Sequence, residues 1–315
     1  MNDKTEKDKP AVYYVKNLND IHDIAKILSK DKSRSWLFRG QNDATWELLT
    51  SLERSANEFN FTKWPEILSA ELSMIEEFKK NAHFYLSDRP QEGDLFEWSC
   101  IIQHFGGPTR LLDCTSSIYI AAFFAIDSSK TDSAIWCFNE SALYNAKNLN
   151  ENEAFNKLWE KYSKNPAKRN LACQKFITQV LRDPDSATKE TIVPVSANYI
   201  SDRLSIQRGK FLALINLSAI SKKKIVFEGN LYTSLNLDPK DLHKIEIDES
   251  KKEYYVPSKE NTAILETCNL AKVVISKTYS KEIAQNLDDL NITSATLFPG
   301  LDGFTRSLKR HFYYE

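Results

Sequence analysis

The sequence lacks the features that mark membrane proteins, disulfide frameworks and metal sites. No apolar run reaches the roughly 18 residues that cross a bilayer, and the charged residues 1–10 contain no apolar segment of a signal peptide. The five cysteines are odd in number and form no Cys-x-x-Cys pair, and the five histidines do not cluster. These absences predict a soluble, cytoplasmic protein with free buried thiols, no bound metal and no membrane partner.

The charge and length of the chain limit its possible folds more than its possible functions. The 315 residues include 42 basic and 43 acidic side chains, a formal net charge of −1, so no global field attracts nucleic acid or an anionic membrane. Any basic surface must be local. With 42% hydrophobic residues, the chain can bury one large core or two modest ones. We predict a flexible lead over residues 1–10 and a single domain over 11–315, with a helical insertion at about 139–190.

The densest cluster of chemically capable residues lies in the stretch 98–127. Residues 106–108, Gly-Gly-Pro, end an apolar helix, because glycine accepts the left-handed C-cap and proline cannot continue the ladder. A short strand over 109–112 leads to a second apolar helix from Ile118, which nearby Asp, Thr and Ser side chains can cap. The polar residues at the two turns are Gln103, His104, Arg110, Asp113 and Thr115. Taken singly, each fits capping and core packing as well as a binding site.

A second polar group stands at the end of an apolar strand over residues 36–41, which delivers Arg39, Gly40 and Gln41. Glycine there lets the backbone turn sharply or approach a ligand closely. A guanidinium that leaves a buried strand needs a carboxylate or phosphate partner. Arg39 therefore either binds an anionic ligand or forms a structural salt bridge. Gln207 stands in the same way at the mouth of a later buried strand.

The region from 139 to 182 turns polar and helical and reads as an insertion that lies over a cleft or carries a partner. Within it, lysines and arginines between 157 and 182 interleave with the aromatic residues Trp159, Tyr162 and Phe176. Such a strip could hold a single nucleic-acid strand, and a solvated helix face is the alternative. Elsewhere we expect further strands at 46–52 and 230–237.

Four blocks in chain order give the sequence a family resemblance. They are residues 38–41 (FRGQ), 103–106 (QHFG) continuing into 108–113 (PTRLLD), 207–211 (QRGKF) and 297–303 (LFPGLDG). The chain resembles the FRG-domain family of bacterial and phage-encoded proteins, named for the tripeptide at 38–40. Cys114 departs from the tryptophan that is common at that position in the family.

The blocks are in turn similar to the three-part site of ADP-ribosyltransferases. This resemblance implies an α+β fold with a split mixed β-sheet core and surrounding and inserted helices, and NAD as co-substrate. With it we predict that NAD is bound by Arg39, Gly40, Gln41, Gln103, Arg110 and Thr115, and that the catalytic residues are His104, Asp113 and Gln207. The match weakens at one point, because Gly209 stands where the third motif usually carries a catalytic Glu.

The chemistry explains why that Glu matters. Breaking the nicotinamide glycosidic bond passes through an oxocarbenium-like centre, so the site needs a carboxylate near the ribose. Asp113 is the candidate substitute, since its place before a helix start favours the ionised form. His104 is either the base for the incoming nucleophile or a hydrogen-bonded core histidine. Arg110 is expected to pair with Asp113 or to bind a second phosphate.

Two classes of function follow. The first is an ADP-ribosyltransferase-like enzyme, a bacterial toxin or anti-phage defence effector, that modifies RNA, DNA or protein and is held in check by an antitoxin partner. The second is a non-catalytic ligand-sensing or protein-binding FRG module. The missing Glu favours the second, and the polar cluster at three strand ends favours the first. The enzyme requires Arg39, Asp113 or Thr115, and Gln207 to converge on one cleft.

Overall fold

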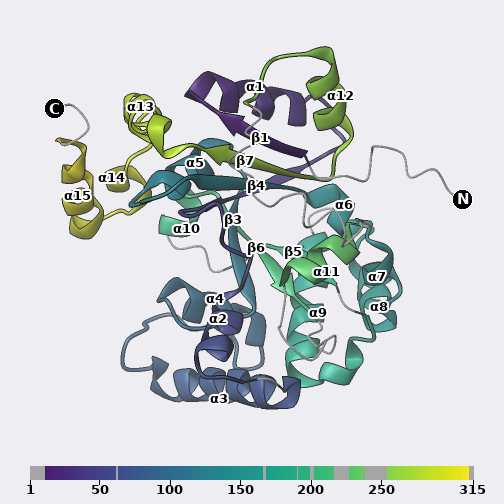
Figure 1. Ribbon diagram of the computed structural model, residues 1–315. Helices are drawn as coiled ribbons and strands as arrows, with labels where there is room; N and C mark the ends of the chain where they lie inside the picture. The colour runs from purple at the N-terminus through teal and green to yellow at the C-terminus, as the bar shows by residue number, and fades with distance from the viewer. Residues whose placement is uncertain are drawn as a thin grey trace, which may run out of the picture.

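The computed structural model describes residues 11–61, 63–165, 168–189, 191–198, 202–215, 227–235, 237 and 254–311. A seven-stranded sheet runs through the molecule in the order β1-β7-β4-β2-β3-β6-β5 (Figure 1). The strands are β1 (Ala11–Val15), β2 (Trp36–Gln41), β3 (Leu111–Thr115), β4 (Ser133–Asn139), β5 (Ile192–Val195), β6 (Gly209–Leu214) and β7 (Leu270–Ile275). The β1–β7 pair is parallel and the other pairs are antiparallel. The predicted α+β class with a mixed sheet is thus confirmed.

Helices cover both faces of the sheet. Beside β1, β7, β4 and β2 lie α1 (Leu18–Leu28), α5 (Ile118–Ile126), α12 (Lys259–Thr267) and α13 (Lys277–Asp289). Beside β3, β6 and β5 lie α4 (Leu95–His104), α8 (Glu153–Tyr162) and α9 (Arg169–Arg182). The remaining longer helices are α2 (Ser51–Glu58), α3 (Trp64–Ala82) and α11 (Phe227–Ser234). Short helical turns are α6 (Glu140–Tyr144), α7 (Lys147–Asn150), η3 (Pro184–Ser186), α10 (Asp202–Ile206), α14 (Ser294–Leu297), α15 (Leu301–Ser307) and η6 (Leu308–Arg310).

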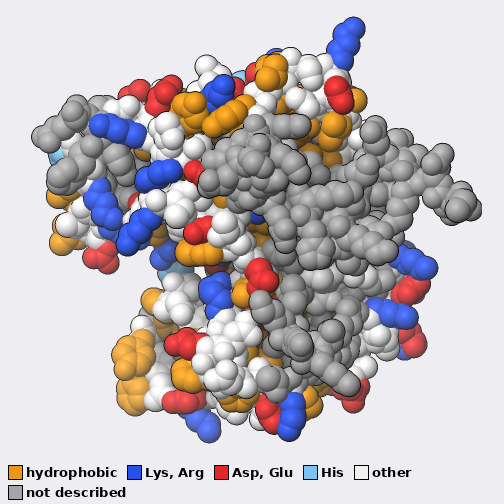
Figure 2. All heavy atoms as spheres, viewed as in Figure 1, with side chains coloured by type: hydrophobic (Ala, Val, Ile, Leu, Met, Phe, Trp, Pro, Cys, Tyr) orange, Lys and Arg blue, Asp and Glu red, His pale blue; other side chains and the backbone are white. Residues whose placement is uncertain are grey.

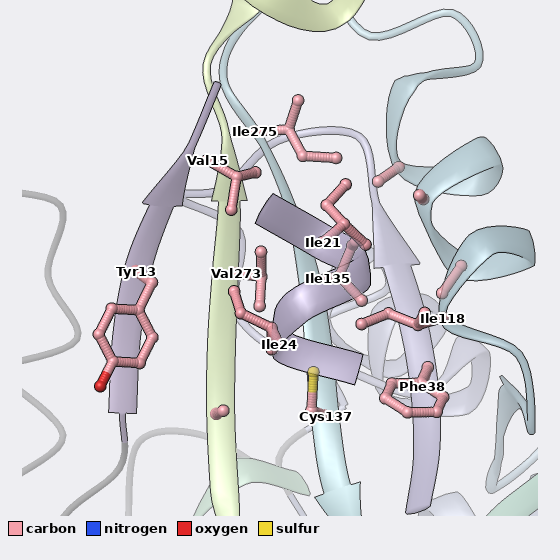
Figure 3. Packing of buried hydrophobic residues seen from close by; sticks show 14 of the residues in the cluster. Tyr13, Val15, Ile21, Ile24, Phe38, Ile118, Ile135, Cys137, Val273 and Ile275 are labelled. Carbon is pink, nitrogen blue, oxygen red and sulfur yellow. The ribbon is translucent and has the colours of Figure 1, made fainter. Parts of the chain in front are cut away.

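The core beside α1 and α5 follows from the hydrophobic pattern. Ile21, Ile24 and Leu28 recur at helical spacing and are buried against Val273 and other residues of the sheet (Figure 3). Full burial of one such side chain contributes about 1.5–3 kcal/mol. Gly40 lets α5 lie directly on β2, because an ideal Cβ there would be 2.1 Å from the carbonyl oxygen of Ala121. The close approach that this glycine permits is therefore to a helix.

The sheet is almost divided between β2 and β3. These strands pair only at Phe38 and Thr115, whereas β2 pairs with β4 along its whole length. Phe38 and Thr115 face the same side of the sheet, so the core beside α5 and the core beside α4 and α9 share that side and flank the division. The opposite side is covered by α2 and α11. A gap therefore remains where the two halves diverge.

Two predicted strands are not observed. Residues 46–50 form neither a strand nor a helix, and Ser51 and Leu52 begin α2, because Thr50 and Glu53 form a capping box. Residues 230–237 fall largely in α11, whose apolar side chains pack on the sheet. The strand expected at 109–112 lies instead at Leu111–Thr115, set by its pairing with β6. The proposed lead at 1–10 lies outside the described residues.

Candidate ligand cavity between the two halves of the sheet

A cavity of about 510 Å³ opens where β2 and β3 diverge. Its walls come from β2, β3, β6, α4, α5 and α10, which are far apart in the sequence. Figure 2 shows the surface hollowed on the left, between the upper and lower halves of the molecule. The predicted site residues among those that line the cavity are Arg39, Gly40, Gln103, His104, Asp113, Thr115 and Gln207. The expected convergence of three strand ends on one cleft is therefore observed, while the roles of these residues stay predictions.

Arg39 spans the division of the sheet. Its Nη1 donates a hydrogen bond of 2.7 Å to the main-chain oxygen of Asp113, which fixes the guanidinium across the gap. Its Nε is buried and has no hydrogen-bond partner, and Arg39 forms no ion pair with any described residue. A buried donor of this kind is costly to leave unpaired. The salt-bridge alternative for Arg39 thus finds no carboxylate within the described part of the chain.

A second guanidinium lies close to the first. Arg54 donates through Nη1 to the main-chain oxygen of Leu49, and it too forms no ion pair with a described residue. Burial lowers the pKa of Arg54, and the charge of Arg39 lowers it further. The charges of Asp113 and Glu53 act against both effects. Two neighbouring guanidiniums, neither of them in an ion pair with a described residue, leave cationic donors that suit an anion.

Asp113 is exposed within β3 and lines the cavity. Its Oδ2 accepts a 2.7 Å hydrogen bond from Nε2 of Gln103. The other end of the Gln103 amide accepts hydrogen bonds from Ser51 and Thr109, so the amide is held in one orientation. Gln103 therefore fixes the carboxylate, and the second carboxylate oxygen is left for a ligand.

His104 ends α4 at the same wall. Burial lowers the pKa of its imidazole, the charge of Arg203 lowers it further, and Asp113 opposes both. The ring is therefore neutral at pH 7 and can accept a proton. The structure records no hydrogen bond for His104, which removes the alternative of a hydrogen-bonded core histidine within the described residues.

Thr115 and Gln207 join the third strand end to the site. Oγ1 of Thr115 donates to the main-chain oxygen of Gln207 over 2.7 Å, and Nε2 of Gln207 donates to the main-chain oxygen of Leu297 over 2.9 Å. Both side chains thus tie together the segments that build the cavity. At Gly209 an ideal Cβ would lie 2.1 Å from Cδ1 of Leu204. Any side chain at 209 would therefore require the Leu204 side chain to move.

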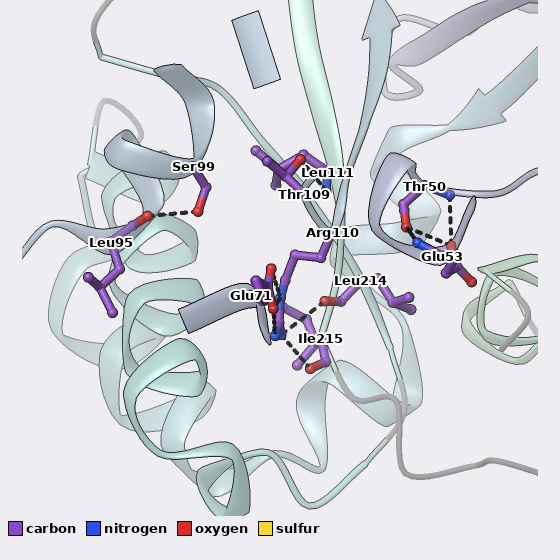
Figure 4. A network of polar contacts seen from close by, with 10 residues as sticks. All are labelled: Thr50, Glu53, Glu71, Leu95, Ser99, Thr109, Arg110, Leu111, Leu214 and Ile215. Carbon is purple, nitrogen blue, oxygen red and sulfur yellow. Dashed lines mark hydrogen bonds and ion pairs between the residues drawn. The ribbon is translucent and has the colours of Figure 1, made fainter. Parts of the chain in front are cut away.

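Two predicted NAD ligands lie elsewhere. Arg110 is fully buried and binds both carboxylate oxygens of Glu71 and the main-chain oxygens of Leu214 and Ile215 (Figure 4). It neither lines the cavity nor pairs with Asp113, because Glu71 already neutralises it. Gln41 is also buried. Its side chain accepts a hydrogen bond from Nε1 of Trp136 and donates one to the main-chain oxygen of Glu47. Both predictions of ligand contact are wrong for this structure.

Other lining residues were not among the predicted site residues. They include Asn42, Phe124 and Arg203, together with Lys210 and Phe211 of the QRGKF block. Arg203 lies on α10 with its guanidinium 4.5 Å from the ring centroid of Phe298, and it forms no ion pair with a described residue. Lys210, in contrast, pairs with Glu140 over 2.7 Å. Only tertiary packing brings α10 to the cavity, so its arginine could not be distinguished from a solvated turn residue.

Several further expectations are settled by burial. All five cysteines are free and buried, as predicted, and burial raises the pKa of the Cys100 and Cys114 thiols at the cavity wall, which leaves them poor nucleophiles. In the insertion, Phe176 is fully buried and Trp159 stacks on Phe155 and Tyr144. Phe176 and Trp159 therefore belong to a core and do not offer their rings to a nucleic-acid strand, whereas Tyr162 is half-buried beside Lys161.

Within the described residues, no helix is long and apolar enough to cross a membrane, and no group of three or more His, Cys, Asp or Glu residues is placed to hold a metal. The class that fold and site define is an α+β protein with a cationic, aromatic-walled cavity at the division of a mixed sheet. Residues 34–134 match the model of the FRG domain family, which supports assigning this part of the chain to that family. No curated protein and no solved structure matches the chain.

Proposed function

We propose that the chain is an ADP-ribosyltransferase-like enzyme that binds NAD in the cavity and modifies a macromolecular target, acting as a bacterial toxin or anti-phage defence effector. The observation that carries this proposal is the buried, unpartnered Nε of Arg39 at the wall of a cavity that also holds Asp113 and His104. A volume of about 510 Å³ lies in the range of small-molecule sites.

The cationic wall suits the phosphates of NAD. Arg39 has one donor fixed on the chain and others free for an anion, and Arg54 and Arg203 add positive charge nearby. Aromatic walls at Phe38, Phe105, Phe124 and Phe211 offer flat apolar surfaces for a ring. The residues present therefore fit a dinucleotide.

NAD supplies an activated glycosidic bond whose cleavage builds positive charge on the ribose. Asp113, held by Gln103, places a carboxylate where it can stabilise that charge. His104, neutral at pH 7, can take the proton of the incoming nucleophile. In this proposal Asp113 takes the place of the glutamate that is absent at Gly209.

Binding is tested first, by calorimetry and thermal shift with NAD. Replacing Arg39 with alanine should weaken binding by about 1.5–3 kcal/mol, since hydrogen bonds to charged groups contribute that much. Arg169→Ala, an exposed arginine outside the cavity lining, serves as the matched control and should bind NAD like the wild type. Equal binding by the Arg39 and Arg169 variants would place the ligand elsewhere.

Activity is tested with labelled NAD and separate pools of protein, RNA and DNA. One pool should become labelled, and Arg39→Ala and Asp113→Ala should both abolish the label. His104→Ala should slow transfer more than NAD cleavage, because a base acting on the nucleophile is not needed to break the glycosidic bond. Expression without a neutralising partner should arrest bacterial growth through the same residues.

The absence of a carboxylate at Gly209 favours a second candidate, a non-catalytic ligand-sensing or protein-binding module. Such a module would bind NAD or a related anion in the same cavity. Wild-type protein that binds NAD but labels no pool would support it and remove the enzyme.

A further inference from the structure

The mouth of the cavity has two chemically different rims. Exposed aromatic side chains mark the lower one: Phe84 is 71%, Tyr85 83% and Phe105 66% exposed. Phe105 lines the cavity, as do Leu86 and Asp88, which follow Tyr85 in the segment joining α3 to α4. Figure 2 shows hydrophobic side chains gathered over that segment, below the hollow. Three large exposed rings, one that lines the cavity and two that directly precede its lining residue Leu86, indicate a binding surface.

The upper rim is basic. Arg203 and Arg306 lie over the Phe298 ring at 4.5 and 4.4 Å from its centroid. Arg306 is also paired with Asp127, whereas Arg203 has no carboxylate partner among the described residues. Lys and Arg side chains gather above the hollow in Figure 2. The acidic residues facing the mouth are Asp88 and Asp113.

We propose that the macromolecule served by this cavity is a single-stranded nucleic acid, with bases on the aromatic rim and phosphates on the basic rim. Every base has a flat face that stacks on an aromatic ring, and the backbone needs only local positive charge. A duplex keeps its bases stacked on each other, so exposed rings would gain nothing from it. This inference rests on the proposed function, in which the cavity acts on a macromolecule.

His104, the proposed proton acceptor, lies next to the aromatic rim of the cavity. The imidazole and the Phe105 ring meet edge to face, with centroids 5.0 Å apart. A base stacked on Phe105 would therefore lie beside the neutral imidazole that we propose as proton acceptor. Tyr85 and Phe84 would hold the neighbouring bases outside the cavity.

Binding is measured by fluorescence anisotropy without NAD, using a labelled 12-nucleotide single strand of DNA, the same strand of RNA, the matching duplex and an acidic peptide. One single strand, DNA or RNA, should bind at least ten times more tightly than duplex or peptide. With two phosphate contacts, the slope of log affinity against log salt should be about −1.4.

Tyr85→Ala and Phe105→Ala should each weaken strand binding about tenfold, and Tyr85→Phe should restore it. Phe59→Ala is the matched control, because Phe59 is 70% exposed but does not line the cavity. Tyr85→Ala should keep wild-type NAD binding. Preference for the peptide or duplex, or equal loss in the Phe59 variant, overturns the inference. A protein that labels a pool with NAD but binds no strand refutes this inference alone, and strand binding without NAD binding refutes only the proposed function.

Discussion

Arg39 lies in β2, Arg110 directly precedes the neighbouring strand β3, and the two arginines have opposite surroundings. Arg110 is fully buried, and its guanidinium is neutralised by Glu71 and capped by two carbonyl oxygens. Arg39 has one hydrogen bond to a main-chain oxygen and a buried Nε with no partner. A charge whose partner is supplied by the chain serves the fold. Arg39 lies beside the cavity without an ion pair to a described residue, and on this difference rests the ligand-binding role that we propose for it.

The largest expected difference between the two arginines is in the free energy of unfolding of their variants. Arg110→Met should lower the free energy of unfolding by about 3–5 kcal/mol, because Glu71 would remain buried and unpaired. The double variant Arg110→Met/Glu71→Leu should recover most of that loss. Arg39→Met should cost less than about 1 kcal/mol, since it strands no buried carboxylate. Urea denaturation of the four proteins measures this, and a loss at Arg39 as large as that at Arg110 would make Arg39 structural.

Glu53 offers a contrast with Glu71, because it is a buried carboxyl that forms no ion pair with a described guanidinium. Burial raises its pKa from 4.5 to about 7, against the opposing hydrogen bonds from Thr50 and Phe227. The folded chain therefore binds this proton more tightly than the unfolded chain, and the stability it contributes at low pH is lost as pH rises from about 4.5 to about 7. The loss should be about 3 kcal/mol.

Glu53→Gln removes that titration while keeping an amide oxygen as acceptor. The difference in unfolding free energy between wild type and variant should shift in favour of the variant between pH 5 and pH 8. A difference that does not vary with pH would mean that Glu53 is charged in the folded protein.

The smallest effect concerns His104. Arg203→Gln should raise the pKa of its imidazole by removing a nearby positive charge, and Asp113→Asn should lower it by removing a negative one. NMR titration of the ring protons follows both variants, with Arg169→Gln as a control that should leave the pKa unchanged. Shifts of the same sign in the Arg203 and Asp113 variants would contradict the arrangement of the three groups.

Short-range patterns predicted several elements well. Helical spacing of Ile21, Ile24 and Leu28 marks α1, and the Gly-Gly-Pro sequence marks the end of α4. The capping box at Thr50 and Glu53 was a visible signal for α2, and the apolar residues before it favoured a strand instead. The strand predicted at 230–237 was wrong for a similar reason, because an apolar stretch of that length suits a buried helix as well as a strand.

The residues of the candidate site show the same contrast between local sequence patterns and tertiary contacts. Arg39, Asp113, Thr115 and Gln207 were found because motif spacing places polar groups where buried strands end or begin. Arg110 and Gln41 were misassigned because residue type does not reveal which partner lies across the core. Arg203 and the exposed ring of Tyr85 were not predicted, because each lies in a short segment without a periodic pattern, and Phe105 was part of the QHFG block but received no role.

Apolar patterns and capping residues, which act over a few positions, indicated the free buried thiols and the polar groups at three strand ends, and the resemblance to ADP-ribosyltransferases implied the α+β class. Tertiary structure alone decided that β2 and β3 part after a single residue pair, and that this gap becomes the cavity. It also decided that Arg110 is neutralised by Glu71 and that Nε of Arg39 has no hydrogen-bond partner. Those outcomes depend on contacts between residues tens of positions apart, where the partner, and not the residue type, sets the electrostatic result.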